Sequence, residues 1–145
     1  MPKDFTEIYT LFRLLAVCHT VVVDRDENGE IIYQASSPDE LALIQGAKQV
    51  GFTLIEKNTT TMTIKNEHTD RDEVYEILAE FPFDSTRKRM SLIVKFGNEI
   101  IHLCKGADNI MLPRINFEKR NNDKIQIMKD LLMFAKSGLR TLVVA

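Results

Sequence analysis

The chain has 145 residues, of which 44% are hydrophobic, and a formal net charge of −2. This length fits one domain, and the composition is ordinary for a packed globular core. A near-neutral balance argues against a broad nucleic-acid-binding surface, which usually carries a basic stripe or a high pI. No apolar run reaches the 18 residues that favour a transmembrane helix. Cys18 and Cys104 lie far apart in apolar runs, which favours buried thiols in a reducing cytosol.

Hydrophobic periodicity and turn signals predict helices and short strands along the whole chain. The expected elements, in chain order, are a helix over 4–18, β-rich runs over 20–24 and 30–35, a helix over 38–50, β-rich runs over 52–56, 61–65, 74–83, 90–96 and 99–104, helices over 107–115 and 123–136, and a last strand over 139–145. Strands joined as hairpins favour an antiparallel sheet of about six or seven strands flanked by helices. The prediction is therefore a single α+β domain over 1–145, and the apolar end of the chain suggests a piece of a longer protein.

Capping signals define the helix over 38–50 most sharply. Ser37 can cap its first turn, Pro38 suits the first helical position, and Glu40 would complete a capping box. Gly51 stands where a left-handed residue ends a helix. Gly138 is expected to end the helix over 123–136 in the same way.

The common self-sufficient catalytic motifs are absent from the sequence. It contains neither the Gly-x-x-x-x-Gly-Lys-Ser/Thr loop nor the Gly-x-Gly-x-x-Gly fingerprint of nucleotide-binding proteins. The three histidines and two cysteines do not have a metal-ligand spacing, and no serine lies in a nucleophile elbow. The chain is therefore not expected to be a complete enzyme or to hold a metal by itself.

Four segments carry a family resemblance. They are Ser36-Ser37-Pro38-Asp39-Glu40-Leu41-Ala42-Leu43, Phe83-Asp84-Ser85-Thr86-Arg87-Lys88-Arg89-Met90-Ser91, Lys105-Gly106-Ala107-Asp108 and Gly138-Leu139-Arg140-Thr141-Leu142. In this order they resemble the nucleotide-binding domain of P-type ATPases. The particular residues of the first three segments resemble the phospholipid-transporting (flippase) branch of that family. The resemblance covers about 12–145. Two departures, a short connection before the last segment and Asp130 in place of a common histidine, bear on subtype only.

Phe83, Ser85 and Lys88 are the first site residues that the resemblance implies. From the residues alone, Phe83 beside Pro82 is better explained as a core residue, whereas the resemblance makes it the ring that stacks on adenine. Three consecutive cations are more often a solvated face than a site. In a strand that begins near Arg87, however, Lys88 faces the side opposite its neighbours, and the resemblance places it along the nucleotide. Ser85 would add a polar contact.

Lys105, Arg140 and Glu40 complete the implied set. Lys105 ends an apolar strand and would put its ammonium at the mouth of a cavity, where Gly106 lets the backbone pass close to a ligand. Arg140 would begin the last strand and contact phosphate, unless it forms a surface ion pair. Glu40 has a sufficient role in the capping box, and the resemblance also places it by the adenine amino group. Asp39 is a weaker alternative that the helix dipole explains.

The resemblance implies a division of labour within a larger pump. This domain would bind ATP and present its terminal phosphate to an aspartate of a separate phosphorylation domain, which would also hold Mg²⁺. The full protein would be an integral membrane protein that moves phospholipid, with this piece in the cytosol, an actuator domain, a transmembrane region and an accessory subunit. The alternatives are the nucleotide-binding domain of a cation pump, an interaction domain, or a module that holds single-stranded RNA with Phe83 and Arg87-Lys88-Arg89.

Overall fold

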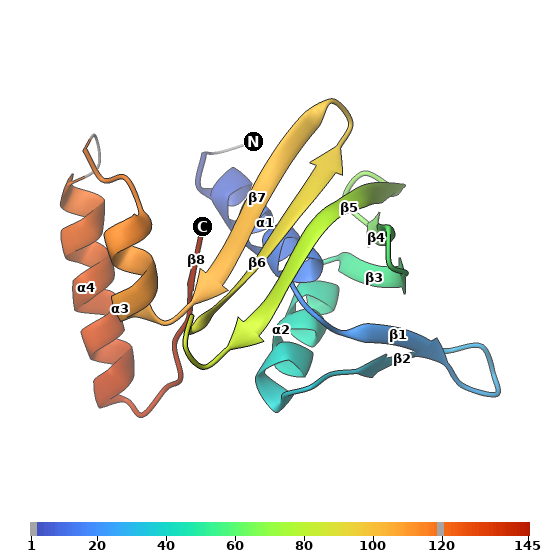
Figure 1. Cartoon of the computed structure of the whole chain (residues 1–145), viewed down its shortest axis with the longest axis horizontal. Helices are drawn as coiled ribbons and strands as arrows, with labels where there is room; N and C mark the ends of the chain where they lie inside the picture. The colour runs from blue at the N-terminus through green and yellow to red at the C-terminus, as the bar shows by residue number, and fades with distance from the viewer. Residues whose placement is uncertain (1–2, 119–120) are drawn as a thin grey trace. The chain divides into compact units, whose positions relative to one another are not determined.

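The computed structural model describes residues 3–118 and 121–145, and its elements follow the expected order (Figure 1). Its helices are α1 (Lys3–Val17), α2 (Pro38–Gln49), α3 (Asp108–Met111), the 3₁₀ turn η1 (Leu112–Arg114) and α4 (Asn121–Lys136). Its strands are β1 (Val22–Arg25), β2 (Ile31–Gln34), β3 (Phe52–Lys57), β4 (Thr61–Asn66), β5 (Arg71–Asp84), β6 (Arg89–Phe96), β7 (Glu99–Gly106) and β8 (Val143–Val144). Within the described part of the chain, no helix is long and apolar enough to cross a membrane.

Six strands form one sheet, whose order from β3 to β8 follows the order of the chain. The printed register is antiparallel for β3 with β4, β4 with β5, and β7 with β8. Strands β1 and β2 form a separate antiparallel hairpin. Because the helices stand beside hairpin-linked strands and do not alternate with parallel ones, the expected α+β class with an antiparallel sheet is confirmed.

The chain forms two compact units. The first consists of Met1–Pro82 and Ser91–Leu103, and the second of Phe83–Met90 and Cys104–Ala145. Strands β5, β6 and β7 each contribute residues to both units. The expectation that 1–145 is one nucleotide-binding domain stays a prediction.

In the first unit, helices and strands bury a shared apolar core. Helix α1 packs against α2 and β3, and α2 also packs against β3. Alternate residues of β4 point inward, as a strand with one covered face requires. The buried hydrophobic residues of this unit include Val17, Val21, Ile44, Leu54, Met62, Ile64 and Leu92.

The capping chemistry of α2 agrees with its sequence in part. Ser37 is the N-cap, and its Oγ accepts the backbone N–H of Glu40 at 3.2 Å. Pro38 occupies the start of the helix, and Gly51 has a φ of +90° just beyond its end. A side chain at Gly51 would also meet the ring of His68, whose Nε2 would lie 2.9 Å from the new Cβ. Two independent constraints therefore require glycine at this position.

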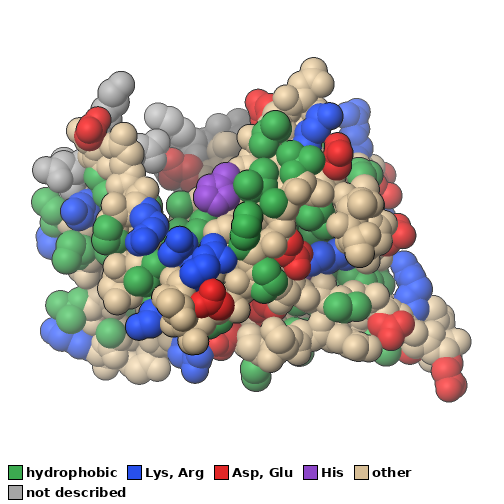
Figure 2. Space-filling view, in the orientation of Figure 1, with side chains coloured by type: hydrophobic (Ala, Val, Ile, Leu, Met, Phe, Trp, Pro, Cys, Tyr) green, Lys and Arg blue, Asp and Glu red, His purple; other side chains and the backbone are tan. Residues whose placement is uncertain are grey.

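The second unit has a smaller core under its helices. Cys104, Met111 and Val143 are buried together, and Leu112, Ile115 and Leu131 pack against them. The end of β7 pairs with β8 through Lys105 with Val144 and Gly106 with Val143. Helix α4 is apolar beyond this contact, because Ile125, Met128, Leu132 and Met133 are exposed. At the place of α4, Figure 2 accordingly shows hydrophobic side chains among Lys and Arg side chains on the surface.

The expectation of a long final strand over 139–145 is wrong. Strand β8 comprises Val143 and Val144, and Ala145 continues the pairing through two backbone hydrogen bonds with Cys104, at 2.7 and 2.9 Å. Residues 139–142 form an irregular segment after α4. The apolar run Leu142-Val143-Val144-Ala145 predicts β structure, but the register of the sheet ends where Gly106 finishes β7.

A partly buried polar cluster joins α1 to the sheet inside the first unit. The Arg13 Nε donates to Glu73 Oε2 at 2.7 Å and to the Tyr75 hydroxyl at 2.8 Å. Tyr75 in turn donates to Glu73 Oε2 at 2.6 Å, and Asn66 donates to Oε1 at 2.8 Å. The Tyr75 ring stacks on Phe96 with centroids 4.7 Å apart. Burial, together with the bond to Glu73, raises the pKa of Tyr75.

Replacement of Gly51 by alanine is expected to destabilise the chain. A left-handed backbone costs a non-glycine residue about 1–2 kcal/mol, and the new Cβ would also displace His68. Gly46→Ala is the matched control, because Gly46 lies inside α2 with open space around it. That change should stabilise the chain by roughly 0.5–1 kcal/mol. Urea unfolding of both variants checks the pair, and equal shifts of the same sign would contradict the assigned backbone.

High pH should destabilise the fold through Tyr75. Its pKa is raised on folding, so its contribution is complete below pH 10, where an unfolded tyrosine begins to ionise, and declines as the pH rises further. The slope from this residue is at most about 1.4 kcal/mol per pH unit. Tyr75→Phe keeps the ring and removes the titration, so its unfolding free energy should fall less steeply above pH 10. Tyr33→Phe is the comparison, since burial raises the pKa of Tyr33 as well. Identical slopes for wild type and Tyr75→Phe would refute the assignment.

Candidate functional site

Five of the six predicted site residues belong to the second unit. Phe83 comes from the end of β5, Ser85 and Lys88 from the connection between β5 and β6, Lys105 from the end of β7, and Arg140 from the segment after α4. Glu40 is in α2 and therefore in the first unit. Three of the four sequence segments thus fold into one compact body.

Phe83 is an exposed aromatic residue and not a core residue. Its relative exposure is 63%, although it lies within β5, one residue before the strand ends. The explanation of Phe83 as core, which its sequence neighbours favour, is therefore wrong. An exposed ring at the end of a strand has a free face that a planar ligand can cover. Ser85, two residues on, is also exposed.

A tight turn from Asp84 to Lys88 joins β5 to β6. The Asp84 carboxylate accepts the backbone N–H groups of Thr86 at 2.7 Å and Arg87 at 2.9 Å. The Asp84 carbonyl accepts the N–H of Lys88 at 2.7 Å. These N–H groups, Arg87 first, lower the pKa of the Asp84 carboxyl. The side chain thus organises the turn in the way that aspartate does in Asx-turns.

Lys88 occupies the last position of this turn with a φ of +52°. The expected strand alternation from Arg87 onward is therefore wrong, because β6 begins only at Arg89. The direction of Lys88 follows from a left-handed backbone and not from the period of a strand. Left-handed lysine is uncommon, since the position suits glycine or asparagine better. Lys88 is exposed, and Met90, two residues on, is buried.

The Lys105-Gly106-Ala107 segment runs directly beside this turn. The Ala107 N–H donates to the Lys88 carbonyl at 3.2 Å. A Cβ at Gly106 would lie 2.7 Å from both the Lys88 carbonyl oxygen and Arg89 Cβ, which no side chain could tolerate. Lys105 itself is 6% exposed, so its ammonium is covered together with its aliphatic stem, whereas the sequence predicts an ammonium at the mouth of a cavity.

Arg140 is positioned by the way α4 ends. Gly138 has a φ of +70°, its N–H donates to the Ala135 carbonyl at 3.0 Å, and the Leu139 N–H donates to the Phe134 carbonyl at 3.0 Å. This pair of bonds is the Schellman arrangement, in which a left-handed glycine reverses the chain after a helix. Arg140 follows two residues later and is exposed, but it lies before β8 and does not begin a strand as expected.

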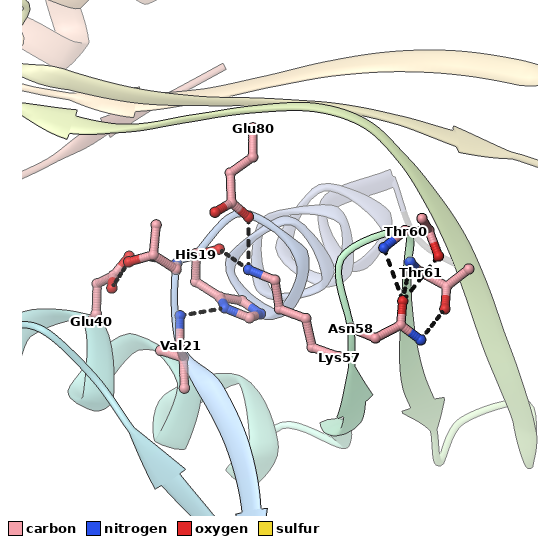
Figure 3. A network of polar contacts seen from close by, with 9 residues as sticks. His19, Val21, Glu40, Lys57, Asn58, Thr60, Thr61 and Glu80 are labelled. Carbon is pink, nitrogen blue, oxygen red and sulfur yellow. Dashed lines mark hydrogen bonds and ion pairs between the residues drawn. The ribbon is translucent and has the colours of Figure 1, made fainter.

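Glu40 takes part in a polar network of the first unit (Figure 3). Its carboxylate accepts the Thr20 backbone N–H at 3.0 Å and the Thr20 hydroxyl at 2.7 Å. The neighbouring His19 contributes its carbonyl to Lys57 Nζ at 3.1 Å, and Lys57 forms an ion pair with Glu80 at 2.7 Å. The Glu40 side chain therefore reaches back to the segment between α1 and β1, while the recorded part of the expected capping box is the bond from the Glu40 N–H to Ser37 Oγ.

Sequence reasoning left Asp84 and Thr20 without roles. Asp84 stands one residue after Phe83 within the recognised segment, and an aspartate followed by Ser-Thr is a turn signal that could have identified it. No local pattern links Thr20 to Glu40, because their contact joins residues twenty positions apart.

The described residues do not fit a protein-held metal. Among residues 3–118 and 121–145, no group of three or more His, Cys, Asp or Glu side chains is placed to hold an ion. Mg²⁺ at nucleotide sites is usually bound by one or two carboxylates together with phosphates and water. No donor set of this chain is therefore assigned to Mg²⁺.

Comparison with known proteins places the chain in a family. The model of the P-type ATPase cytoplasmic domain N matches residues 7–145. Similar proteins are the phospholipid-transporting ATPase IC of Xenopus tropicalis, 43% identical over 94% of this chain, and that of Homo sapiens, 44% identical over 94%. The phospholipid-transporting ATPase DRS2 of Saccharomyces cerevisiae is 40% identical over 99%. This chain spans 11% of the length of each of these relatives. The branch indicated by the motifs is thus the one to which these relatives belong by name, and the chain belongs to the family of the cytoplasmic domain N of P-type ATPases.

Proposed function

We propose that the chain binds ATP through the second unit. The observation that carries this proposal is the 63% exposure of the Phe83 ring, in the unit that also contributes Lys88, Lys105 and Arg140. An exposed aromatic ring suits a purine, and the exposed Lys88 and Arg140 suit phosphates, which are the two elements that recognition of a nucleoside triphosphate needs. Lys105 is covered, so its proposed contact requires its ammonium to become accessible to ATP. Ser85, exposed in the adjoining turn, would add a polar contact.

Charge distribution supports an anionic ligand at this unit. The second unit contains eleven Lys and Arg residues against five Asp and Glu residues, which gives a net charge of +6. The first unit contains eight against sixteen, a net charge of −8. The total of −2 therefore conceals a strongly basic unit. A concentrated positive charge raises the local concentration of a small anion and its rate of association.

The role within the full protein follows from the family. We propose that the chain presents the terminal phosphate of ATP to a phosphorylation domain elsewhere in the same protein, and that Mg²⁺ is held there and by the phosphates. The names of the relatives support a phospholipid-transporting pump over a cation pump. This chain would then be the cytosolic part of an integral membrane protein that also has actuator and transmembrane regions, an accessory subunit and a phospholipid substrate. By itself it would bind ATP without hydrolysing it.

An ATP titration followed by amide NMR shifts tests the binding site. Shifts should cluster at Phe83, Lys88 and Lys105, with smaller changes for GTP, because the purine edge differs. Phe83→Ala should weaken ATP binding by roughly tenfold, since aromatic stacking on a base contributes about 1–3 kcal/mol. Lys105→Ala should weaken it to a similar degree.

Two controls sharpen this titration. Phe81→Ala removes another partly exposed phenylalanine of β5 that the proposal does not assign to the nucleotide, so ATP affinity should stay nearly unchanged. A short single-stranded RNA tests the rival nucleic-acid module and should compete poorly with ATP. ATP shifts that persist at full strength in both Phe83→Ala and Lys105→Ala would exclude the proposed site.

The resemblance assigns Glu40 of the first unit to the adenine amino group, and its bonds to Thr20 allow a nucleotide role to be separated from a structural one. Glu40→Gln should weaken ATP more than it weakens GTP, which has no amino group at that ring position. Thr20→Val removes the hydroxyl bond while leaving the Glu40 carboxylate in place, and should reduce the free energy of unfolding by about 1–3 kcal/mol. It should change the ratio of ATP to GTP affinity less than Glu40→Gln does. Parallel calorimetric titrations and urea unfolding give both quantities. An unchanged ratio of ATP to GTP affinity in Glu40→Gln would rule out the adenine contact.

A further inference from the structure

The turn before β6 uses an unusual residue at its most demanding position. Lys88 has a φ of +52°, where glycine or asparagine would be adopted more readily. The turn could therefore be made more easily by another residue, and the presence of lysine points to a requirement for its side chain. A residue held in a sparsely populated conformation persists only when its surroundings determine that conformation.

Hydrogen bonds and one close approach determine the conformation of Lys88. The Lys88 N–H donates to the Asp84 carbonyl at 2.7 Å, and the Lys88 carbonyl accepts the Ala107 N–H at 3.2 Å. The Asp84 carboxylate fixes the intervening residues, because it accepts the N–H groups of Thr86 and Arg87 at 2.7 and 2.9 Å. Gly106 lies so close that no side chain fits between it and the Lys88 carbonyl. Asp84 is the one side chain among these contacts that organises the turn.

We propose that Asp84 is a positioning residue for ATP: its carboxylate shapes the 84–88 turn so that the left-handed Lys88 directs its ammonium to the nucleotide. This inference rests on the proposed ATP site. Asp84 does not itself contact ATP, since a carboxylate would repel the phosphates. Its lowered pKa agrees with a carboxylate that stays ionised while its oxygen accepts two N–H groups.

Substitutions at Asp84 test the proposal by ATP affinity. Asp84→Ala removes the acceptor and should weaken ATP binding about fivefold, within the range that one or two hydrogen bonds provide. Asp84→Asn keeps an oxygen acceptor in the same place. Its ATP affinity should therefore be within about twofold of the wild-type affinity, although the charge differs by one unit. If the effect of Asp84 were only electrostatic, removal of a negative charge would strengthen ATP binding in both variants, and that result would overturn the proposal.

A double-mutant cycle with Lys88 separates positioning from general stability. Lys88→Ala should weaken ATP binding by itself. Asp84→Ala should cause little further loss of ATP affinity in the Lys88→Ala background, because Asp84 acts through Lys88. Additive losses would contradict the proposal. The Cα and Cβ shifts of Lys88, which report a left-handed backbone, should move in Asp84→Ala and stay in Asp84→Asn. If Asp84→Ala does not fold, Asp84→Ser, whose shorter side chain offers a weaker acceptor, should give an intermediate affinity.

The outcome also distinguishes this inference from the proposed function. Suppose that the wild-type protein binds ATP, that Phe83→Ala does not, and that Asp84→Ala binds ATP as tightly as wild type. The positioning role of Asp84 is then refuted, and the proposed ATP site remains. If wild type does not bind ATP at millimolar concentration, both statements fall together.

Discussion

The close approach of Gly106 to the Lys88-Arg89 backbone is the constraint on which the second unit depends. Only a residue without a side chain fits there, because a Cβ would lie 2.7 Å from both the Lys88 carbonyl oxygen and Arg89 Cβ. The Ala107 N–H completes the contact by donating to that carbonyl. Two segments of the second unit that are separate in the sequence are thereby joined through their backbones, with Lys88 and Lys105 on either side of the junction.

Charge is divided between the two units in a way that a whole-chain value conceals. A net charge of −2 argues against a general nucleic-acid-binding surface, yet the second unit alone carries +6. The acidic first unit contributes the helix with Glu40 and the Arg13–Glu73–Tyr75 cluster, whose paired charges stabilise packing.

Local sequence signals predict most of this fold and less of the site. Ser37, Pro38 and Gly51 mark the ends of α2 because capping and left-handed glycine are chemical requirements of a helix end. The short β8 was not predictable, since its length depends on where β7 offers a partner. The conformation of Lys88 escaped for a related reason. A strand that begins near Arg87 would give Lys88 an extended backbone, and the contacts from Asp84 and Ala107 impose a left-handed one instead. The candidate site residues were identified from the motif resemblance. The exposure of the Phe83 ring and the bonds from Asp84 to the turn became visible only in the structure.

The two buried thiols have a practical consequence. Cys18 lies in the first unit with 0% exposure and Cys104 in the second with 8% exposure, so each unit contains one thiol that a reagent reaches only after local opening. The rate at which each cysteine is alkylated under native conditions then measures the opening free energy of its own unit. Mass spectrometry of the two tryptic peptides would separate these rates in a single sample. The chain thus contains a natural pair of reporters for whether nucleotide protects one half of the molecule or both.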